Sequence, residues 1–157
     1  MKRHLVTVIA AVYGCLAALV GAQAADPIRN EPIVVSVQLG TASGDLVISP
    51  RDLTFERGKY YKLVLKNSSD VEHRLSVASF ASSVRTYGTL AIDRGTVIGR
   101  PNFKGRVPSG YLPRVVEVAP GGVAEWNFVP LYHASARIGC TIDGHAEGGM
   151  MAKFDVI

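Results

Sequence analysis

The residues best suited to chemistry lie near the C-terminus, where Cys140, His145 and Met150 are spaced as Cys-x4-His-x4-Met in a glycine-containing segment. A loop of this kind between two strands can turn all three side chains toward one point. Two imidazoles, one thiolate and a weakly bound thioether form the donor set of a copper site that transfers electrons. The segment supplies only one imidazole, so the sequence predicts a copper site that needs a second histidine.

Two histidines could complete this donor set, because only His73 and His133 remain once the N-terminus and His145 are set aside. His73 follows a turn cluster at 67–70 and precedes an alternating apolar pattern, which places it at the start of a strand and near one end of a sheet. His133 lies seven residues before Cys140. If the segment between them is a strand, His133 is more than about 10 Å from the thiol. The sequence therefore favours His73, with His133 as the alternative.

The first residues, 1–24, predict a signal peptide. Positive charge at Lys2 and Arg3 precedes an apolar run, and residues 22–24 (AQA) have the small-x-small pattern of a cleavage site. An uncleaved anchor and a lipid-attachment site at Cys15 are the alternatives. We expect the mature chain to begin near Ala25, in the periplasm or outside the cell, with no membrane span after cleavage.

Cleavage changes the cysteine count and the charge of the chain. Cys15 is removed with the signal, so Cys140 becomes the only thiol and no internal disulfide can form. An unpaired thiol in an oxidising compartment calls for burial or a metal. The formal charge falls from +4 to about +2 when Lys2 and Arg3 are subtracted, and the remaining charges are interspersed. Nothing in this pattern predicts a nucleic-acid partner or a polybasic membrane patch.

The rest of the chain predicts one all-β domain over 33–157, preceded by a polar tether at 25–32. Short apolar runs alternate with turn clusters at close spacing, which favours a β-sandwich or a barrel-like Greek key. Residues 114–118 and 123–129 alternate on either side of a Pro-Gly-Gly and predict a hairpin-like pair. Residues 78–113 alternate poorly, and we expect an excursion from the sheet there, a loop with a short helix near 80–90.

Three stretches of the chain resemble the cupredoxin family. Residues 140–145 (CTIDGH), with Met150 five residues later, are similar to its copper loop, with the spacing of its rusticyanin- and auracyanin-like members. Residues 118–122 (VAPGG) and 63–67 (LVLKN) resemble the strands that lead to the turn and to the first histidine. The resemblance implies that His73, Cys140, His145 and Met150 are the copper ligands, in an antiparallel Greek-key sandwich.

This resemblance predicts an exported protein that binds one copper ion and carries single electrons as the ion cycles between Cu(I) and Cu(II). The alternative is a copper tolerance, storage or delivery protein without a fixed electron-transfer role. Its partners are then redox proteins or copper donors and acceptors, and we expect a monomer.

Too few histidines remain for a multicopper cluster, and no nucleophile or phosphate-loop motif is present, so we expect no enzyme activity. Asn67 and Thr141 are candidates for orienting the ligands.

Overall fold

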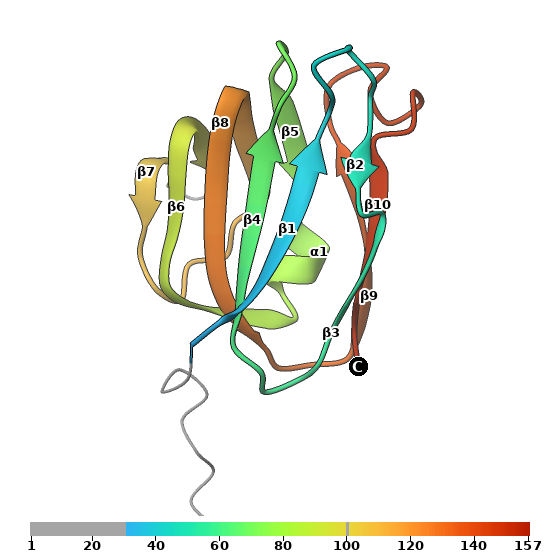
Figure 1. Cartoon of the computed structure of the whole chain (residues 1–157). Coiled ribbons are helices and arrows are strands. Elements are labelled where there is room, and N and C mark those ends of the chain that lie inside the picture. Colours follow the sequence, from blue (N-terminus) through green and yellow to red (C-terminus); the bar gives the residue numbers. More distant parts are fainter. Residues whose placement is uncertain (1–30, 100) are drawn as a thin grey trace, which may run out of the picture.

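The structure is a computed structural model that describes residues 31–99 and 101–157 (Figure 1). The predicted signal peptide, and the tether up to residue 30, lie outside the described residues. None of the helices among the described residues is long and apolar enough to span a membrane.

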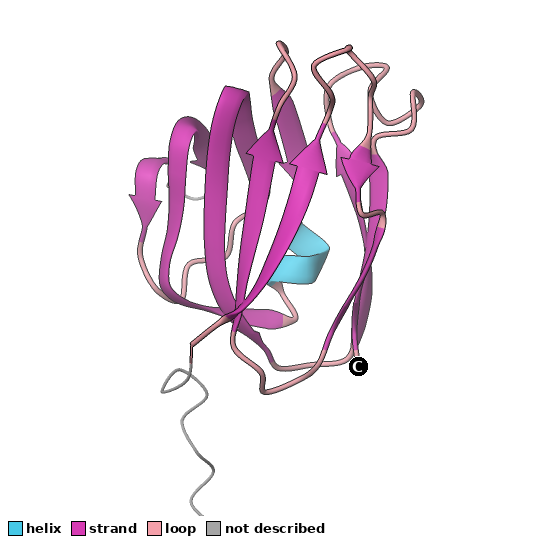
Figure 2. Cartoon of the chain, viewed as in Figure 1, coloured by secondary structure: helices cyan, strands magenta, loops and turns pink. Residues whose placement is uncertain are grey.

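The described residues form ten strands and one short helix (Figure 2). In chain order they are β1 (Ile33–Leu39), β2 (Ile48–Ser49), β3 (Asp52–Phe55), β4 (Tyr61–Asn67), β5 (His73–Ser76), α1 (Ala78–Ala81), β6 (Val84–Ile98), β7 (Phe103–Val107), β8 (Val115–Pro130), β9 (Ala134–Cys140) and β10 (Met151–Val156).

The strands follow the order β2-β1-β4-β8-β5-β9-β10-β3, with β6 attached to β8 and β7 attached to β6. Figure 1 shows β7, β6, β8, β4 and β1 side by side, curling away from the group formed by β9, β10 and β3. Most pairs are antiparallel, but β1 pairs with β4 and β3 pairs with β10 in parallel. The predicted all-β sandwich is confirmed, and these two parallel pairs are a departure from a purely antiparallel arrangement.

The core fills the space enclosed by the curled strands. Along β4 and β8 the side chains alternate between buried and more exposed positions, as strands with one face on a core do. Five aromatic rings meet at its centre with centroids 5.2–5.7 Å apart in neighbouring pairs. They belong to Phe55, Phe80, Trp126, Phe128 and Phe154, all fully buried. This packed core holds the strands that carry the candidate site.

The prediction that residues 78–113 leave the sheet is wrong for most of this range. After the four-residue α1, the chain enters β6, which pairs along β8, and then β7, which pairs with β6. The β6–β8 register shifts twice, between Thr86 and Leu90 and between Asp93 and Gly95. The first shift places two extra residues in β6, which interrupts the alternation, and after the second shift the buried position moves from Leu90 and Ile92 to Val97, on the other face. The pattern that identifies a strand is therefore lost from the sequence.

The predicted hairpin around Pro120 is also wrong, since both of its arms belong to the single strand β8. The first arm pairs with β5 and the second with β4, rather than with each other. At this point β8 bends from one part of the sandwich to the other. A Cβ on Gly122 would lie 2.7 Å from Arg94 O and 2.9 Å from Asp93 O. The Pro-Gly-Gly thus marks a bend in β8 where the backbone of β6 lies very close. In the sequence, the same three residues have the composition of a turn.

Candidate metal centre

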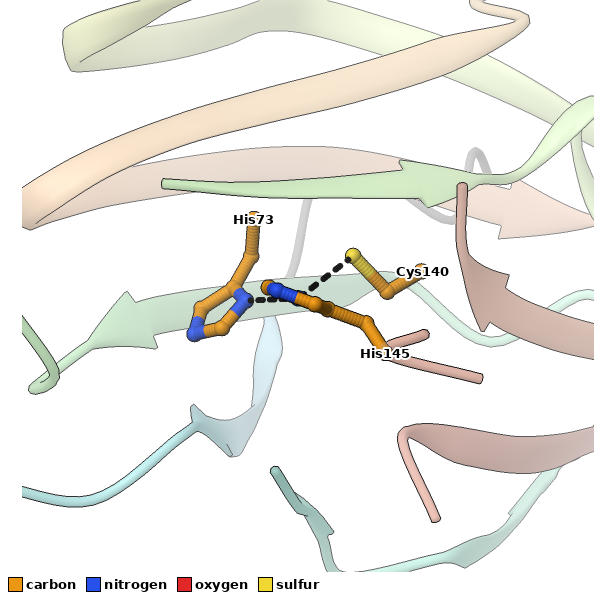
Figure 3. A group of neighbouring side chains, drawn as sticks. All are labelled: His73, Cys140 and His145. Carbon is orange, nitrogen blue, oxygen red and sulfur yellow. Dashed lines mark hydrogen bonds between the residues drawn. The ribbon is translucent and has the colours of Figure 1, made fainter. Parts of the chain in front are cut away.

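Two of the predicted ligands are carried on paired strands. His73 is the first residue of β5, and Cys140 is the last residue of β9. These strands are antiparallel, with Leu75 opposite Cys140. The start of β5 and the end of β9 therefore lie at the same end of the sandwich, and the imidazole and the thiol reach the same point (Figure 3).

The third predicted ligand, His145, comes from the loop between β9 and β10 and points toward the other two (Figure 3). Its Nδ1 lies 3.3 Å from His73 Nδ1 and 3.5 Å from Cys140 Sγ. The ligand atoms of the three residues all lie within 4.8 Å of one another. His73 is 0% exposed and Cys140 4% exposed, whereas His145 is partly exposed. The group is thus closed on the core side and reachable from solvent on one side.

The loop that carries His145 is held by its own backbone. His145 N donates to Ile142 O at 3.1 Å, and Met150 N donates to His145 O at 3.0 Å. Cys140 N donates to Met150 O at 3.1 Å and closes the base of the loop. Gly144 takes a φ of 78°, a left-handed conformation that favours glycine. These bonds fix the histidine over the end of β9.

Met150 and Met151 differ in their surroundings. Met150 is fully buried, directly before β10 and bonded through its backbone to both Cys140 and His145. Met151, on the opposite face of the strand, is 36% exposed. This placement is compatible with a thioether ligand at Met150, and ligation by Met150 stays a prediction.

His133 lies away from the group. It precedes β9, at the end of that strand opposite Cys140, and its Nδ1 is 3.3 Å from Val156 O. The metal-competent group found among the described residues contains His73, as the sequence favoured, and does not contain His133.

The Cys140 sulfur receives a hydrogen bond from the backbone of the neighbouring strand. Arg74 N donates to Cys140 Sγ at 3.4 Å, while Arg74 O accepts from Thr141 N at 2.8 Å. The Arg74 guanidinium points elsewhere and pairs with Glu72 at 2.8 Å and Glu117 at 3.1 Å. The backbone donor thus holds the orientation of the sulfur, the atom that binds a metal as a thiolate.

The residues proposed to orient the ligands act differently from one another. Thr141 Oγ1 donates to Arg74 O at 3.3 Å and so supports the strand pairing rather than a ligand ring. Asn67 reaches His73 through Ser69, whose Oγ lies 2.8 Å from Asn67 Oδ1 and 2.9 Å from His73 Nε2. Sequence reasoning missed Ser69. Its only signal was membership of the turn cluster four residues before the histidine.

Burial lowers the pKa of His73 from its ordinary value of 6.5 to about 4, and the neighbouring His145 adds to the effect. Charging an imidazole inside the sandwich removes it from water, and this disfavours the cationic form. His73 is therefore neutral at pH 7. A neutral imidazole has the free nitrogen lone pair that a metal ion requires.

The donor set suits a particular class of metal. One thiolate and two imidazoles fit copper or zinc, and the soft sulfur with two nitrogens is the set found in electron-transfer copper sites. The buried His73 and Cys140 leave their donor atoms facing each other and His145, which is the arrangement a bound ion needs. The residues present thus fit a copper ion.

The fold is similar to that of solved copper enzymes. McoA multicopper oxidase from Aquifex aeolicus matches with a TM-score of 0.55 and 15% sequence identity, over 80% of this chain and 29% of that chain. The multicopper oxidase from Campylobacter jejuni matches with a TM-score of 0.52 and 12% identity, over 81% of this chain and 30% of that chain. These oxidases contain cupredoxin-like domains. This chain has the cupredoxin fold.

The cupredoxin fold agrees with the family resemblance seen in the sequence. The chain spans less than a third of the length of these oxidases. Auracyanin from Roseiflexus castenholzii matches at a TM-score of 0.47 and 16% identity, over 79% of this chain and 96% of that chain. No protein-family model and no curated protein matches the chain.

The lowered pKa of His73 predicts how the stability of the metal-free protein depends on pH. In the unfolded chain the imidazole gains a proton near pH 6.5, whereas in the folded protein it stays neutral down to about pH 4. The stabilisation is fully present above pH 6.5 and is lost as the pH falls toward 4, by about 3 kcal/mol.

Urea unfolding of the metal-free protein at pH 7 and pH 4 measures this loss, with His73→Gln as the control that lacks the titrating ring. The wild type should lose about 3 kcal/mol more than the variant. Equal losses in the two proteins would contradict the buried, neutral state of His73.

Proposed function

We propose that this chain is an exported copper protein that carries single electrons. It would bind one copper ion through His73, Cys140 and His145, with Met150 as a weaker fourth ligand. The observation that supports this proposal is the convergence of one thiol and two imidazoles within 4.8 Å at one end of a β-sandwich. The copper-binding domain covers 33–157, after a signal peptide (1–24) and a tether (25–32), and functions as a monomer in the periplasm or outside the cell.

Copper in such a site supplies one-electron chemistry, because thiolate favours Cu(I) and imidazole also suits Cu(II). The protein contributes rigidity. His73 and Cys140 are held on hydrogen-bonded strands and buried, so their donor atoms cannot rearrange freely when the charge changes. Little reorganisation is then needed between the two oxidation states, as electron transfer requires.

His145 provides the route to a partner, since it is the partly exposed member of the group. Its loop contains Gly144, Ala146 and Gly148, whose small side chains let another protein approach closely. Redox encounters use small, short-lived interfaces. We infer that a redox protein docks over this loop and exchanges an electron through the edge of His145.

The second candidate is copper storage, tolerance or delivery, with copper donor and acceptor proteins as partners. Met151 favours it, because this residue is 36% exposed and directly follows the buried Met150. A surface thioether is a soft donor for Cu(I). The observation concerns one side chain, whereas the rigidity of the whole site favours electron transfer.

We propose that the chain is not itself an oxidase. Its sequence contains four histidines, of which His4 lies in the predicted signal and His133 lies at the far end of β9. Neither can join a second copper cluster near the site. The oxidase activity of the structurally similar proteins belongs to chains more than three times as long as the part that matches.

Copper binding is tested by adding Cu(II) to the purified metal-free protein and recording the visible spectrum. We expect an intense thiolate-to-copper band that is absent in Cys140→Ser. His73→Gln should weaken copper binding by more than about 100-fold, because removing a ligand costs more than removing a residue that orients one. The matched control, His133→Gln, should bind as the wild type does. A colourless copper complex would contradict the proposed ligand set, and so would equal losses of copper affinity in the two histidine variants.

The neighbouring methionines form a second matched pair. Met150→Leu preserves the volume of a buried side chain but removes its sulfur, so we expect the visible band to persist and the reduction potential to rise, since a donor to Cu(II) is lost. Met151→Leu should leave both unchanged. An unaltered potential in Met150→Leu would remove Met150 from the ligand set.

Electron self-exchange separates the two candidate functions. A carrier with little reorganisation exchanges electrons rapidly between its own Cu(I) and Cu(II) forms. In mixtures of the two forms, proton NMR signals of His145 should broaden in proportion to the concentration of the Cu(II) form. Separate, unbroadened signals would argue for storage or delivery.

A further inference from the structure

A buried chain of hydrogen bonds lies behind His73, on the side away from the other ligands. Ser69 Oγ is 2.9 Å from His73 Nε2 and 2.8 Å from Asn67 Oδ1. The exposed fractions of Asn67, Ser69 and His73 are 1%, 7% and 0%. Buried polar groups of this kind must satisfy one another, so the direction of each bond can be worked out.

The orientation of the Asn67 amide is fixed by backbone groups that can play only one role. Its Nδ2 donates to Val71 O at 2.7 Å and to Val118 O at 2.9 Å, and carbonyl oxygens only accept. Its Oδ1 accepts from Ser69 N at 3.0 Å, and a backbone N–H only donates. A flipped amide would lose all three bonds.

The orientation of Asn67 determines the role of the Ser69 hydroxyl. Two of its other neighbours, Asn67 Oδ1 at 2.8 Å and Val71 O at 3.1 Å, are acceptors, and the third, Val71 N at 3.4 Å, donates to it. A hydroxyl proton directed at His73 Nε2 would leave both acceptor oxygens facing lone pairs of Ser69 Oγ, so the proton goes to one of the two oxygens. Ser69 Oγ is left with lone pairs facing His73 Nε2, and this bond exists only if Nε2 carries the proton.

We propose that Asn67 and Ser69 select the tautomer of His73 that has its proton on Nε2 and its lone pair on Nδ1. Nδ1 is the atom that lies 3.3 Å from His145 Nδ1 within the metal-competent group. Ser69 is thus a positioning residue, which presents the correct nitrogen before any metal arrives. This inference deepens the proposed function and rests on it, since the ion to be received is copper.

The surroundings of the bond keep the tautomer fixed. Gly40, with a φ of +62°, covers the pair with its backbone: a Cβ at this position would lie 2.7 Å from His73 Nε2 and 3.0 Å from Ser69 Oγ. The missing side chain lets the loop close over the hydrogen bond. Water can donate a hydrogen bond to one tautomer and accept one from the other, but it has no access to the fully buried ring.

The same assignment defines the proton that copper displaces. With a lone pair on His73 Nδ1, the 3.3 Å contact to His145 requires His145 Nδ1 to donate. Copper binding at both Nδ1 atoms then requires the His145 proton to move from Nδ1 to Nε2, a change of tautomer that leaves the number of protons on the ring the same. His73 gives up no proton.

The test is nitrogen-15 NMR of the histidine rings in the copper-free full chain at pH 7, followed by copper titration. In the wild type, His73 should show a protonated Nε2 and an unprotonated Nδ1. Ser69→Ala should populate the other tautomer and weaken copper binding by about 10- to 100-fold. The control is Ser68→Ala, the same change in the same turn, and it should leave both readings unchanged.

A protonated Nδ1 on wild-type His73 would overturn the inference, and so would unchanged affinity and tautomer in Ser69→Ala. If Ser69→Ala does not fold, the wild-type ring spectrum alone still decides. Failure of the proposed function has a different outcome: the wild type would show the Nε2 proton and yet bind no copper.

Discussion

The candidate site depends on the pairing of β5 with β9. Leu75 lies opposite Cys140 in this pairing, so His73, two residues earlier, reaches the same end of the sandwich. A shift of the register by one residue would turn every side chain of the strand to the other face. The pairing also aims Arg74 N at the Cys140 sulfur. A single backbone register thus sets the position of two ligand atoms and the hydrogen bond to one of them.

The two halves of the site have different physical characters. His73 and Cys140 belong to the buried core and are held by strands and by the Asn67–Ser69 chain. His145 belongs to a loop whose internal hydrogen bonds fix it while leaving its ring partly exposed. A site built in this way combines a rigid, dry interior with one accessible edge. This combination supports the proposed electron transfer, because a rigid interior rearranges little when the charge of a bound ion changes.

The parts of the structure that depend on neighbouring residues could be predicted from the sequence. Cys140, His145 and Met150 lie close together in the chain, and the turn cluster before His73 predicts the strand that begins there. The parts that depend on contacts across the fold could not be predicted. The register shifts of β6 interrupt its alternation, and the bend of β8 has the sequence of a turn until its partners β4 and β5 are known. Ser69 could not be singled out, because its role depends on the backbone that orients Asn67.

In the proposed site, one thiolate and two imidazoles of this chain hold a single copper ion. X-ray absorption at the copper edge measures this most directly, since it identifies and counts the atoms bound to the metal. For the protein loaded with one equivalent of copper, we expect one short copper–sulfur bond and two imidazole nitrogens, with the sulfur lost in Cys140→Ser. Coordination by nitrogen and oxygen alone in the wild type would contradict it.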